Sequence, residues 1–312
     1  MPVVVSSGVL AAVFVRFAPI LFVLIWSTGW IVTKYVTPFA DPLTFLSVRY
    51  VGAAALMVVM SLAAASKWPE RPADYGHALM SGILLHGVYL GGVWWAIGAG
   101  LPVGISGLIA AVQPLLTALL ARRTTGERLR PAQWLGVVVG FVGLVLAISP
   151  KFTGIGAATL SDFALPIAVN VLGMVGVTLG TIYQKRYLQT GGLRPMTALQ
   201  YVGAFAVTLP VAWLVEPMRI EWVPEIFLGL AWCVFGLSFG AIMLLLMLIR
   251  QGAVSRAASL IYLIPPTVAV EAYFLYGETM SPVQILGGLI TVIGVYLVSA
   301  RQADAPPTRL SS

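Results

Sequence analysis

The chain repeats its landmark residues at one fixed spacing, and this repeat constrains the fold more strongly than any other feature. Pro114 and Pro265 lie 151 positions apart. The other pairs at this spacing include Lys34 and Lys185, Tyr50 and Tyr201, Gly52 and Gly203, Glu127 and Glu278, Gln133 and Gln284, Gly136 and Gly287, and Gly143 and Gly294. A shared spacing over most of both halves indicates a duplicated unit. We therefore expect two related repeats, 1–149 and 150–302, and a polar tail, 303–312, that is expected to be disordered and cytoplasmic.

The composition places this duplicated unit in a membrane. Hydrophobic residues make up 59% of the chain and charged residues 9%, whereas soluble domains carry about 25% charged residues. A helix needs roughly 20 apolar residues to cross the hydrocarbon core of a bilayer. Apolar runs of about that length predict spans at 17–36, 43–65, 76–98, 103–122, 132–149, 161–184, 196–215, 225–249, 254–276 and 283–300. The predicted fold class is an all-α polytopic membrane protein with ten transmembrane helices, five in each repeat.

An odd number of spans per repeat has a consequence for topology. The second copy must enter the bilayer from the side opposite to the first, which makes an inverted repeat. Many secondary transporters use this layout to alternate access between the two faces of a membrane. The loop from Arg122 to Arg130 carries four arginines, whereas its copy around Glu278 carries no lysine or arginine. Opposite basic content is expected when two homologous loops end on opposite faces.

The basic residues also predict the orientation. Fourteen of the 18 lysines and arginines fall on the side of the N-terminus, and the other four are Lys34, Arg49, Lys151 and Arg219. The positive-inside rule then puts both termini in the cytoplasm. The net charge of +7 is thus a signal of topology, and because no soluble basic surface is predicted, we expect no nucleic-acid partner. The expected partners are the lipid bilayer and a small-molecule substrate.

Several chemistries lack the residues that they need. Cys233 is the single cysteine, and His77 and His86 are the only histidines. The chain has no HExxH zinc motif and no phosphate-binding loop of the Walker type. We therefore expect no metal, no cofactor and no enzymatic activity.

The chain resembles the drug/metabolite transporter superfamily, in particular its ten-helix EamA-type members. The resemblance rests on the two five-helix copies, on Trp26-Ser27 followed by Lys34, on a proline within the fourth and ninth spans, and on a repeated turn. This turn runs from Gly126-Glu127 to Gln133 and again from Gly277-Glu278 to Gln284. The resemblance implies a secondary transporter of the inner membrane that holds its substrate in a central cavity, most often an exporter of amino acids or related metabolites. The first span lacks the membrane-embedded glutamate of the related small multidrug resistance proteins, so their proton mechanism is not carried over.

The two prolines are candidate hinges. Pro114 and Pro265 fall near the middle of their predicted spans, where a proline removes a helical hydrogen bond and kinks the helix. Small and polar residues share one helical face with each proline, including Gln113 in the first repeat and Tyr262 in the second. We expect these faces to line opposite walls of the cavity. The alternative is that small residues only allow close packing of the helices.

Aromatic residues within the spans are candidates for the remaining cavity wall. Trp26 and Trp30 lie four residues apart on one face of the first helix. Together with Tyr89, Trp94, Tyr183 and Tyr262 they would suit an apolar or cationic ligand, with core packing as the alternative. Asn170 is a further candidate, because an amide within the membrane needs a polar partner.

Four titratable residues are candidates for ion coupling or charge pairing. Glu271 lies in an apolar stretch, where a carboxylate is costly unless it is paired or neutral; it could bind an ammonium group, carry a proton or form a structural ion pair. His86 could shuttle protons or serve as a packing residue. Lys34 and Lys185 occupy matching helix ends, where they could reach the headgroups or pair with an acid as a gate. Arg49 is expected to be an interfacial anchor.

The predicted function is export of amino acids or similar small metabolites by alternating access. One alternative is translocation of a sugar-phosphate or lipid-linked substrate. An alternative of another class is a membrane assembly factor or an intramembrane enzyme. The glycine patterns at 136 and 140, at 176 and 180, and from 287 to 294 are expected to form surfaces for helix contacts. The glycine-rich helices at 132–149 and 283–300 are expected to form scaffold rather than cavity, and they also offer surfaces for a homodimer.

Overall fold

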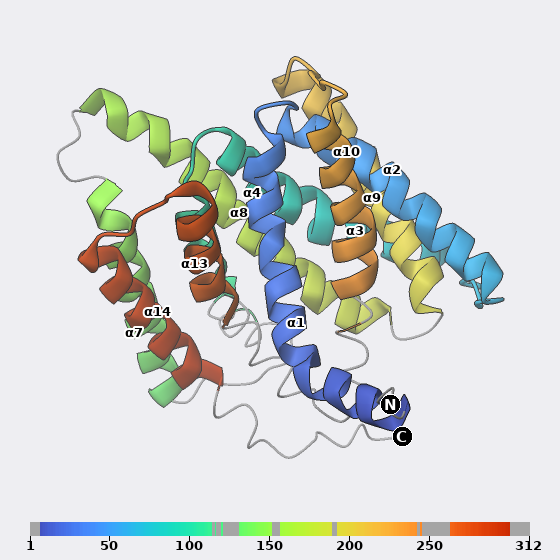
Figure 1. Cartoon of the computed structure of the whole chain (residues 1–312), viewed down its shortest axis with the longest axis horizontal. Helices are drawn as coiled ribbons and strands as arrows, with labels where there is room; N and C mark the ends of the chain where they lie inside the picture. Colours follow the sequence, from blue (N-terminus) through green and yellow to red (C-terminus); the bar gives the residue numbers. More distant parts are fainter. Residues whose placement is uncertain are drawn as a thin grey trace, which may run out of the picture.

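The protein is described here from a computed structural model that places residues 7–113, 116, 120, 131–151, 157–188, 192–241, 244 and 263–299. Helices dominate throughout this part of the chain (Figure 1). Its described residues contain no β-strand, only an isolated antiparallel bridge between Ala40 and Ile220. The prediction of an all-helical fold is therefore confirmed. The predicted disordered tail, 303–312, lies outside the described residues.

The helices of the two halves follow one another in the same order. The first half contains α1 (Ser7–Val36), α2 (Pro42–Ala63), α3 (Pro72–Gly82), the π-helix η1 (Ile83–Val88), α4 (Tyr89–Gly98), α5 (Val103–Ala110), α7 (Pro131–Ile148) and the 3₁₀-helix η2 (Ser149–Lys151). The second half contains α8 (Ala157–Tyr187), α9 (Leu193–Val215), α10 (Pro224–Ala231), the π-helix η3 (Trp232–Ala241), α13 (Ile264–Tyr276) and α14 (Pro282–Ser299).

Prolines and glycines in the sequence account for several of these boundaries. A proline occupies the first turn of α2, α3, α10 and α13, where its missing N–H group costs no helical hydrogen bond. Gly277 ends α13 in the left-handed conformation, with φ at 64°, which glycine adopts without steric cost. The chain can therefore turn sharply towards Glu278.

Six helical segments of the described chain are long and apolar enough to cross a membrane. They are Phe17–Val36, Pro42–Ala63, Pro72–Gly98, Asp162–Tyr187, Leu193–Val215 and Pro224–Ala241. All six coincide with predicted spans to within a few residues, apart from the predicted 225–249, whose last residues are largely not described. Trp134–Ala147 and Pro282–Gly294 are shorter apolar helices. For the predicted spans 103–122 and 254–276, the structure gives mainly α5 and α13.

The helix boundaries recur at the spacing of the sequence repeat. Helix α7 begins at Pro131 and ends at Ile148, and α14 occupies the positions 151 residues later, from Pro282 to Ser299. The π-helices η1 and η3 also overlap at this spacing. Tyr50 of α2 and Tyr201 of α9, which are equivalent in the sequence, stack on each other with ring centroids 6.1 Å apart. Equivalent positions of the two halves thus meet in the buried core.

Glycines bring α7 and α14 into close backbone contact. A side chain on Gly143 would collide with Thr291 and Gly287, and one on Gly294 would collide with Gly140 and Gly136. Contact positions fall along one helix as they rise along the other, so the two helices run antiparallel, side by side at the edge of the bundle (Figure 1). The expectation that these glycines form helix contacts is confirmed.

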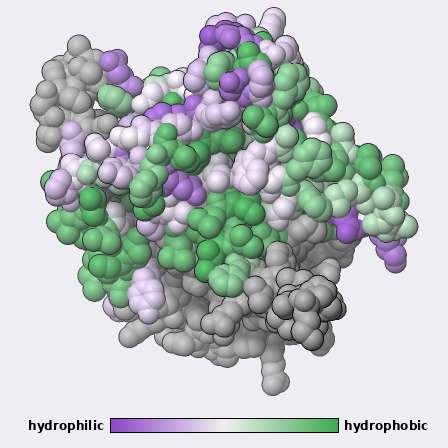
Figure 2. Space-filling model, in the orientation of Figure 1, coloured by the Kyte–Doolittle hydropathy of each residue, from purple (hydrophilic) through white to green (hydrophobic). Residues whose placement is uncertain are grey.

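The outer surface of the bundle is strongly apolar. Figure 2 shows hydrophobic residues over much of the visible described face, with polar residues gathered at the end where the α1–α2 and α9–α10 connections lie. Large exposed side chains include Phe141 and Val145 of α7, Leu289 of α14 and Phe274 of α13. Exposing such an apolar face to water would cost free energy, whereas contact with the lipid tails of a bilayer does not.

Candidate functional site

A seam of polar contacts joins α1 of the first half to α13 of the second. Ser27 Oγ donates a hydrogen bond of 2.7 Å to Glu271 Oε1. One turn further along α1, the backbone oxygen of Ile31 accepts a hydrogen bond of 2.7 Å from the Tyr276 hydroxyl. Because the contact positions rise together along both helices, α1 and α13 run parallel here.

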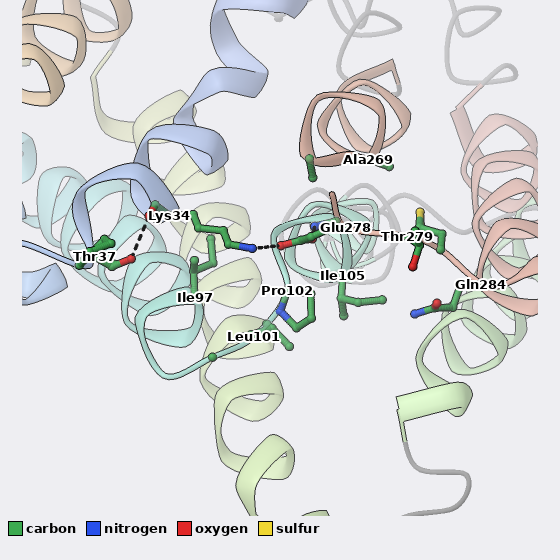
Figure 3. A pocket seen from close by; sticks show the side chains of 15 residues that line it. Lys34, Thr37, Ile97, Leu101, Pro102, Ile105, Ala269, Glu278, Thr279 and Gln284 are labelled. Carbon is green, nitrogen blue, oxygen red and sulfur yellow. Dashed lines mark hydrogen bonds and ion pairs between the residues drawn. The ribbon is translucent and has the colours of Figure 1, made fainter. Parts of the chain in front are cut away.

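The seam ends in an ion pair at the end of α1 (Figure 3). Lys34 Nζ lies 2.7 Å from Glu278 Oε1, and it also lies 4.8 Å from the centroid of the Tyr276 ring. The Glu278 carboxylate accepts N–H groups from Val103 at 3.2 Å and from Gly104 at 3.1 Å. These N–H groups open α5, where helical geometry leaves them without a partner and favours a negative charge. Glu278 therefore ties α1, α5 and the α13–α14 turn together.

A pocket of about 510 Å³ opens beside this ion pair. Figure 3 shows Ile105, Pro102 and Leu101 around Glu278, with Gln284 and Thr279 further along its wall. The lining residues come from α1, α4, α5, α13 and α14 and from the turns between them. Both halves of the chain thus contribute to one pocket. We call this end of the bundle, where α1 ends at Val36 and α5 begins at Val103, the Lys34 end.

A second carboxylate closes another helix start at the Lys34 end. Glu216 accepts N–H groups from Leu43 at 2.8 Å and from Thr44 at 2.9 Å, at the beginning of α2. Burial raises the pKa of Glu216, against the lowering effect of these hydrogen bonds. Nearby, Asp41 Oδ2 accepts the backbone N–H of Arg219 at 2.7 Å. Hydrogen bonds to Glu216 and to Asp41 therefore join the α1–α2 connection of the first half to the α9–α10 connection of the second.

Glu271 lies within the bundle with half of its carboxylate unsatisfied. Its Oε1 accepts the Ser27 hydroxyl, whereas its buried Oε2 has no hydrogen-bond partner. No ion pair of the described residues includes Glu271. A carboxylate in this position can accept a proton or a donor group from a ligand.

The predicted aromatic residues fall into separate groups. Trp30 is buried in the main core with its indole N–H unpartnered, and Trp26 packs against Phe22 with ring centroids 5.3 Å apart. Tyr89 packs against the same core as Trp30. His86, on η1, lies 4.7 Å from the Tyr201 ring, and its Nδ1 atom has no hydrogen-bond partner.

Tyr183 and Lys185 lie at the other end of the bundle. The Tyr183 hydroxyl is 2.7 Å from His77 Nδ1. His77 lies near the beginning of the continuous helical segment Pro72–Gly98. Ile97, which lines the pocket at the Lys34 end, lies near the end of the same segment. At 1.5 Å per residue this separates them by about 30 Å. Tyr183 is therefore not brought together with the residues of the seam, and Lys185 is exposed in the last turn of α8.

The remaining predicted residues have mixed placements. Asn170 is fully buried and donates to Ser106 of α5 at 2.5 Å, while its Oδ1 atom has no partner. Gln113 is half-buried just beyond α5. Pro265 lies in the first turn of the described part of α13, where it breaks no helical hydrogen bond of that part. Pro114 and Tyr262 lie outside the described residues.

Arg49 differs from its expected role as an interfacial anchor. It is 5% exposed, eight residues into α2, and its guanidinium carbon lies 5.9 Å from the Trp94 ring centroid. The expectation of an interfacial anchor was wrong because it used only the position of Arg49 along the helix. It did not consider which face of α2 carries Arg49, and this face is buried in the bundle. The partnership of Ser27 with Glu271 was also missed, since nothing in either local sequence indicates a contact between residues 244 positions apart.

Comparison with known proteins agrees with this architecture. The model of the EamA-like transporter family matches the chain twice, over residues 9–149 and 165–300. The chain is 25% identical to the "uncharacterized inner membrane transporter YedA" of Escherichia coli K12, over 91% of this chain and 92% of that one. It is 22% identical to the "probable amino-acid metabolite efflux pump" of Salmonella typhimurium, over 90% and 93% of the two chains.

A crystal structure shows that the fold is shared with a protein of known structure. The two chains superpose with a TM-score of 0.61 at 19% identity, over 93% of this chain and 99% of the other. The two family matches together span most of the described helices, and the relatives align along nearly their full lengths. The chain therefore belongs to the EamA-like transporter family and is a multi-pass membrane transporter.

Proposed function

We propose that this protein is a secondary transporter that exports amino acids or related small metabolites by alternating access. In this proposal ten helices cross the inner membrane as two inverted five-helix repeats, and both termini are cytoplasmic. The antiparallel packing of α7 and α14, which occupy equivalent positions in the two halves, supports the inversion. The parallel course of α1 and α13 fits the same topology, because the first and ninth spans would cross in the same direction.

The observation that carries the proposal is the polar seam between the two halves. Ser27–Glu271 and Lys34–Glu278 are contacts between side chains, at 2.7 Å each, and they link helices of different repeats. Such contacts can break and re-form when the helices around the cavity rock against the rest of the bundle, whereas interlocked apolar packing resists that motion. The glycine-lined contact of α7 with α14 would then serve as the fixed scaffold.

The proposed substrate class rests on the relative from Salmonella typhimurium, whose name describes amino-acid metabolite efflux. The site is compatible with a zwitterion. Glu271 offers an unpartnered carboxylate oxygen for an ammonium group. The Lys34 end already holds one carboxylate, that of Glu278, through Lys34 and the N–H group of Val103.

Efflux from proteoliposomes tests the proposal. Vesicles containing the purified full-length protein would be loaded with a mixture of amino acids and polyamines, with and without a pH gradient. We expect protein-dependent release of a subset of the amino acids. Release of none of them would overturn the proposed substrate class. Selective transport of a sugar phosphate in a parallel assay would favour the alternative substrate.

A further inference from the structure

Arg49 is a buried cation that has no acidic partner among the described residues. Its side chain is 5% exposed, and its Nε–H group has no hydrogen-bond partner. The ion pairs of the described chain are Lys34–Glu278, Arg71–Asp74 and Arg219–Glu221. An uncompensated charge in a bundle interior is costly, which makes such a residue a functional-site candidate by default.

The equivalent position of the second half shows that the fold does not require this charge. Gln200 stands 151 residues after Arg49, is likewise 5% exposed, and is neutral. Its amide donates a hydrogen bond of 3.1 Å to the buried Ser81 hydroxyl. At the equivalent position of the other repeat, an uncharged side chain is therefore buried with a hydrogen-bond partner in the same chain. The first repeat instead places a cation here, whose Nε–H group has no hydrogen-bond partner among the described residues.

Aromatic rings of both halves lie near Arg49, on α4 and η1 of the first half and on α9 of the second. Its guanidinium carbon lies 5.9 Å from the centroid of the Trp94 ring on α4. The next residue, Tyr50, stacks on Tyr201, whose ring centroid is 4.7 Å from that of His86. His86 contributes a second buried nitrogen, Nδ1, that lacks a hydrogen-bond partner. It lies on η1, and π-helical turns are frequent at functional sites. Two buried nitrogen atoms without a hydrogen-bond partner, Arg49 Nε and His86 Nδ1, therefore lie in a region rich in aromatic rings.

Arg49 lies deeper in the bundle than the described pocket, which it does not line. Arg49 is seven residues beyond Pro42, which places it about 10 Å along α2 from the Lys34 end. Ile97 lines the pocket of about 510 Å³, and Trp94 precedes it by three residues on the same helix. Residues three apart share a helix face. The ring that supports the guanidinium is thus one turn from the pocket wall.

We propose that Arg49 binds the carboxylate of the transported substrate, and that the substrates are neutral amino acids with apolar side chains. A guanidinium presents N–H donors in a planar fork that matches a carboxylate. The bound carboxylate would supply the negative charge that the bundle lacks at this position, and the surrounding rings would contact the apolar side chain. A polyamine would be repelled by the same charge. This inference rests on the proposed transport function, but its binding step can be measured separately.

Binding to the purified full-length protein is the direct test. We expect millimolar L-leucine and L-phenylalanine to raise the melting temperature of the wild-type protein, and leucinamide, which lacks the carboxylate, to leave it unchanged. Arg49→Gln, which copies the neutral residue of the other repeat, should abolish the shift, and Arg49→Lys should retain part of it. The exposed Arg186 provides the control, and Arg186→Gln should respond like the wild type. Equal responses to leucine and leucinamide, no response to either amino acid, or an unchanged shift in Arg49→Gln would overturn the inference.

Transport in proteoliposomes separates this inference from the proposed function. We expect Arg49→Gln to reduce L-leucine efflux at least tenfold. Wild-type protein that binds leucine through Arg49 but never releases it across the membrane would refute the export function and leave the carboxylate site standing. Wild-type efflux that is fully retained in Arg49→Gln would refute the site and leave export standing. The leucinamide comparison uses only wild-type protein, so the test survives a variant that fails to fold.

Discussion

Lys34 and Glu278 come from opposite halves of the chain, yet their side chains meet at 2.7 Å. The same carboxylate accepts two N–H groups at the start of α5. One acidic residue therefore combines an inter-repeat ion pair with a helix cap. The two functions can be separated by substitution, because a cap needs an acceptor and an ion pair needs only opposite charges.

Substituting Glu278 should weaken the fold at the Lys34 end. Glu278→Ala removes the cap, which contributes about 1 kcal/mol, and a partly exposed ion pair, which contributes up to about 1 kcal/mol. We expect the free energy of unfolding to fall by about 1–2 kcal/mol. Denaturation in detergent micelles measures it, with the exposed Glu70→Ala as the control. Equal stability of the two variants would contradict the double role of Glu278.

Reversing the ion pair should fail to restore the wild-type state. Lys34→Glu combined with Glu278→Lys re-creates opposite charges. The new lysine cannot accept the N–H groups of Val103 and Gly104, and it places a positive charge at a helix N-terminus. We expect the double variant to remain less stable than the wild type and to transport more slowly. Full recovery in both measurements would show that the cap is dispensable.

Neutralising Glu271 should stop transport without unfolding the protein. Glu271→Gln keeps an oxygen that can accept the Ser27 hydroxyl but removes the charge and the ability to gain a proton. We expect amino-acid efflux to fall at least tenfold while the melting temperature stays near that of the wild type. Ser27→Ala, which removes the partner and keeps the charge, should retain most transport. If Glu271→Gln leaves efflux and its pH dependence unchanged, Glu271 has no part in the mechanism.

Adding one methyl group between α7 and α14 should be costly. A Cβ atom at Gly143 would meet the backbone of Thr291 and Gly287, which cannot rotate away. We expect Gly143→Ala to lower the free energy of unfolding by about 1–3 kcal/mol. Gly76 is the matched control, because a Cβ atom there meets nothing within 4 Å. Gly76→Ala should be neutral or stabilising by up to about 1 kcal/mol, and a similar loss at both sites would contradict the close contact.

The proposed orientation can be measured with single cysteines. The native Cys233 is fully buried, and a Cys233→Ser background removes it. A membrane-impermeant maleimide added to intact cells should label Thr279→Cys at the Lys34 end and should label Glu70→Cys only after the cells are opened. Both positions are exposed. The reverse pattern would place the termini outside the cytoplasm.

The sequence predicted the helices better than it predicted their contacts. Apolar runs gave the boundaries of most of the long described helices to within a few residues, because hydrophobic length is a local property. The glycine pattern indicated contact surfaces on α7 and α14, but it did not indicate that these two helices contact each other. These features depend on residues close together in the chain or on the repeat itself.

The site was only partly predictable because it depends on contacts between distant segments. For Lys34, pairing with an acid was one of the alternatives, beside reaching the headgroups, but nothing near it singles out Glu278 from the other carboxylates. Arg49 was misjudged because its burial follows from how α2 packs against neighbouring helices. Tyr183 was grouped with the cavity by residue type alone, whereas it contacts His77 far along the bundle.

The most direct test of alternating access is to lock the seam between the repeats. Lys34→Cys and Glu278→Cys would be combined in the Cys233→Ser background, and L-leucine efflux from proteoliposomes would be measured before and after a reducible thiol cross-linker is added. The account predicts that cross-linking stops efflux and that reduction restores it, while Lys34→Cys alone is unaffected by the reagent. Unchanged efflux from fully cross-linked protein would show that α1 and the α13–α14 turn need not separate, which would contradict the account.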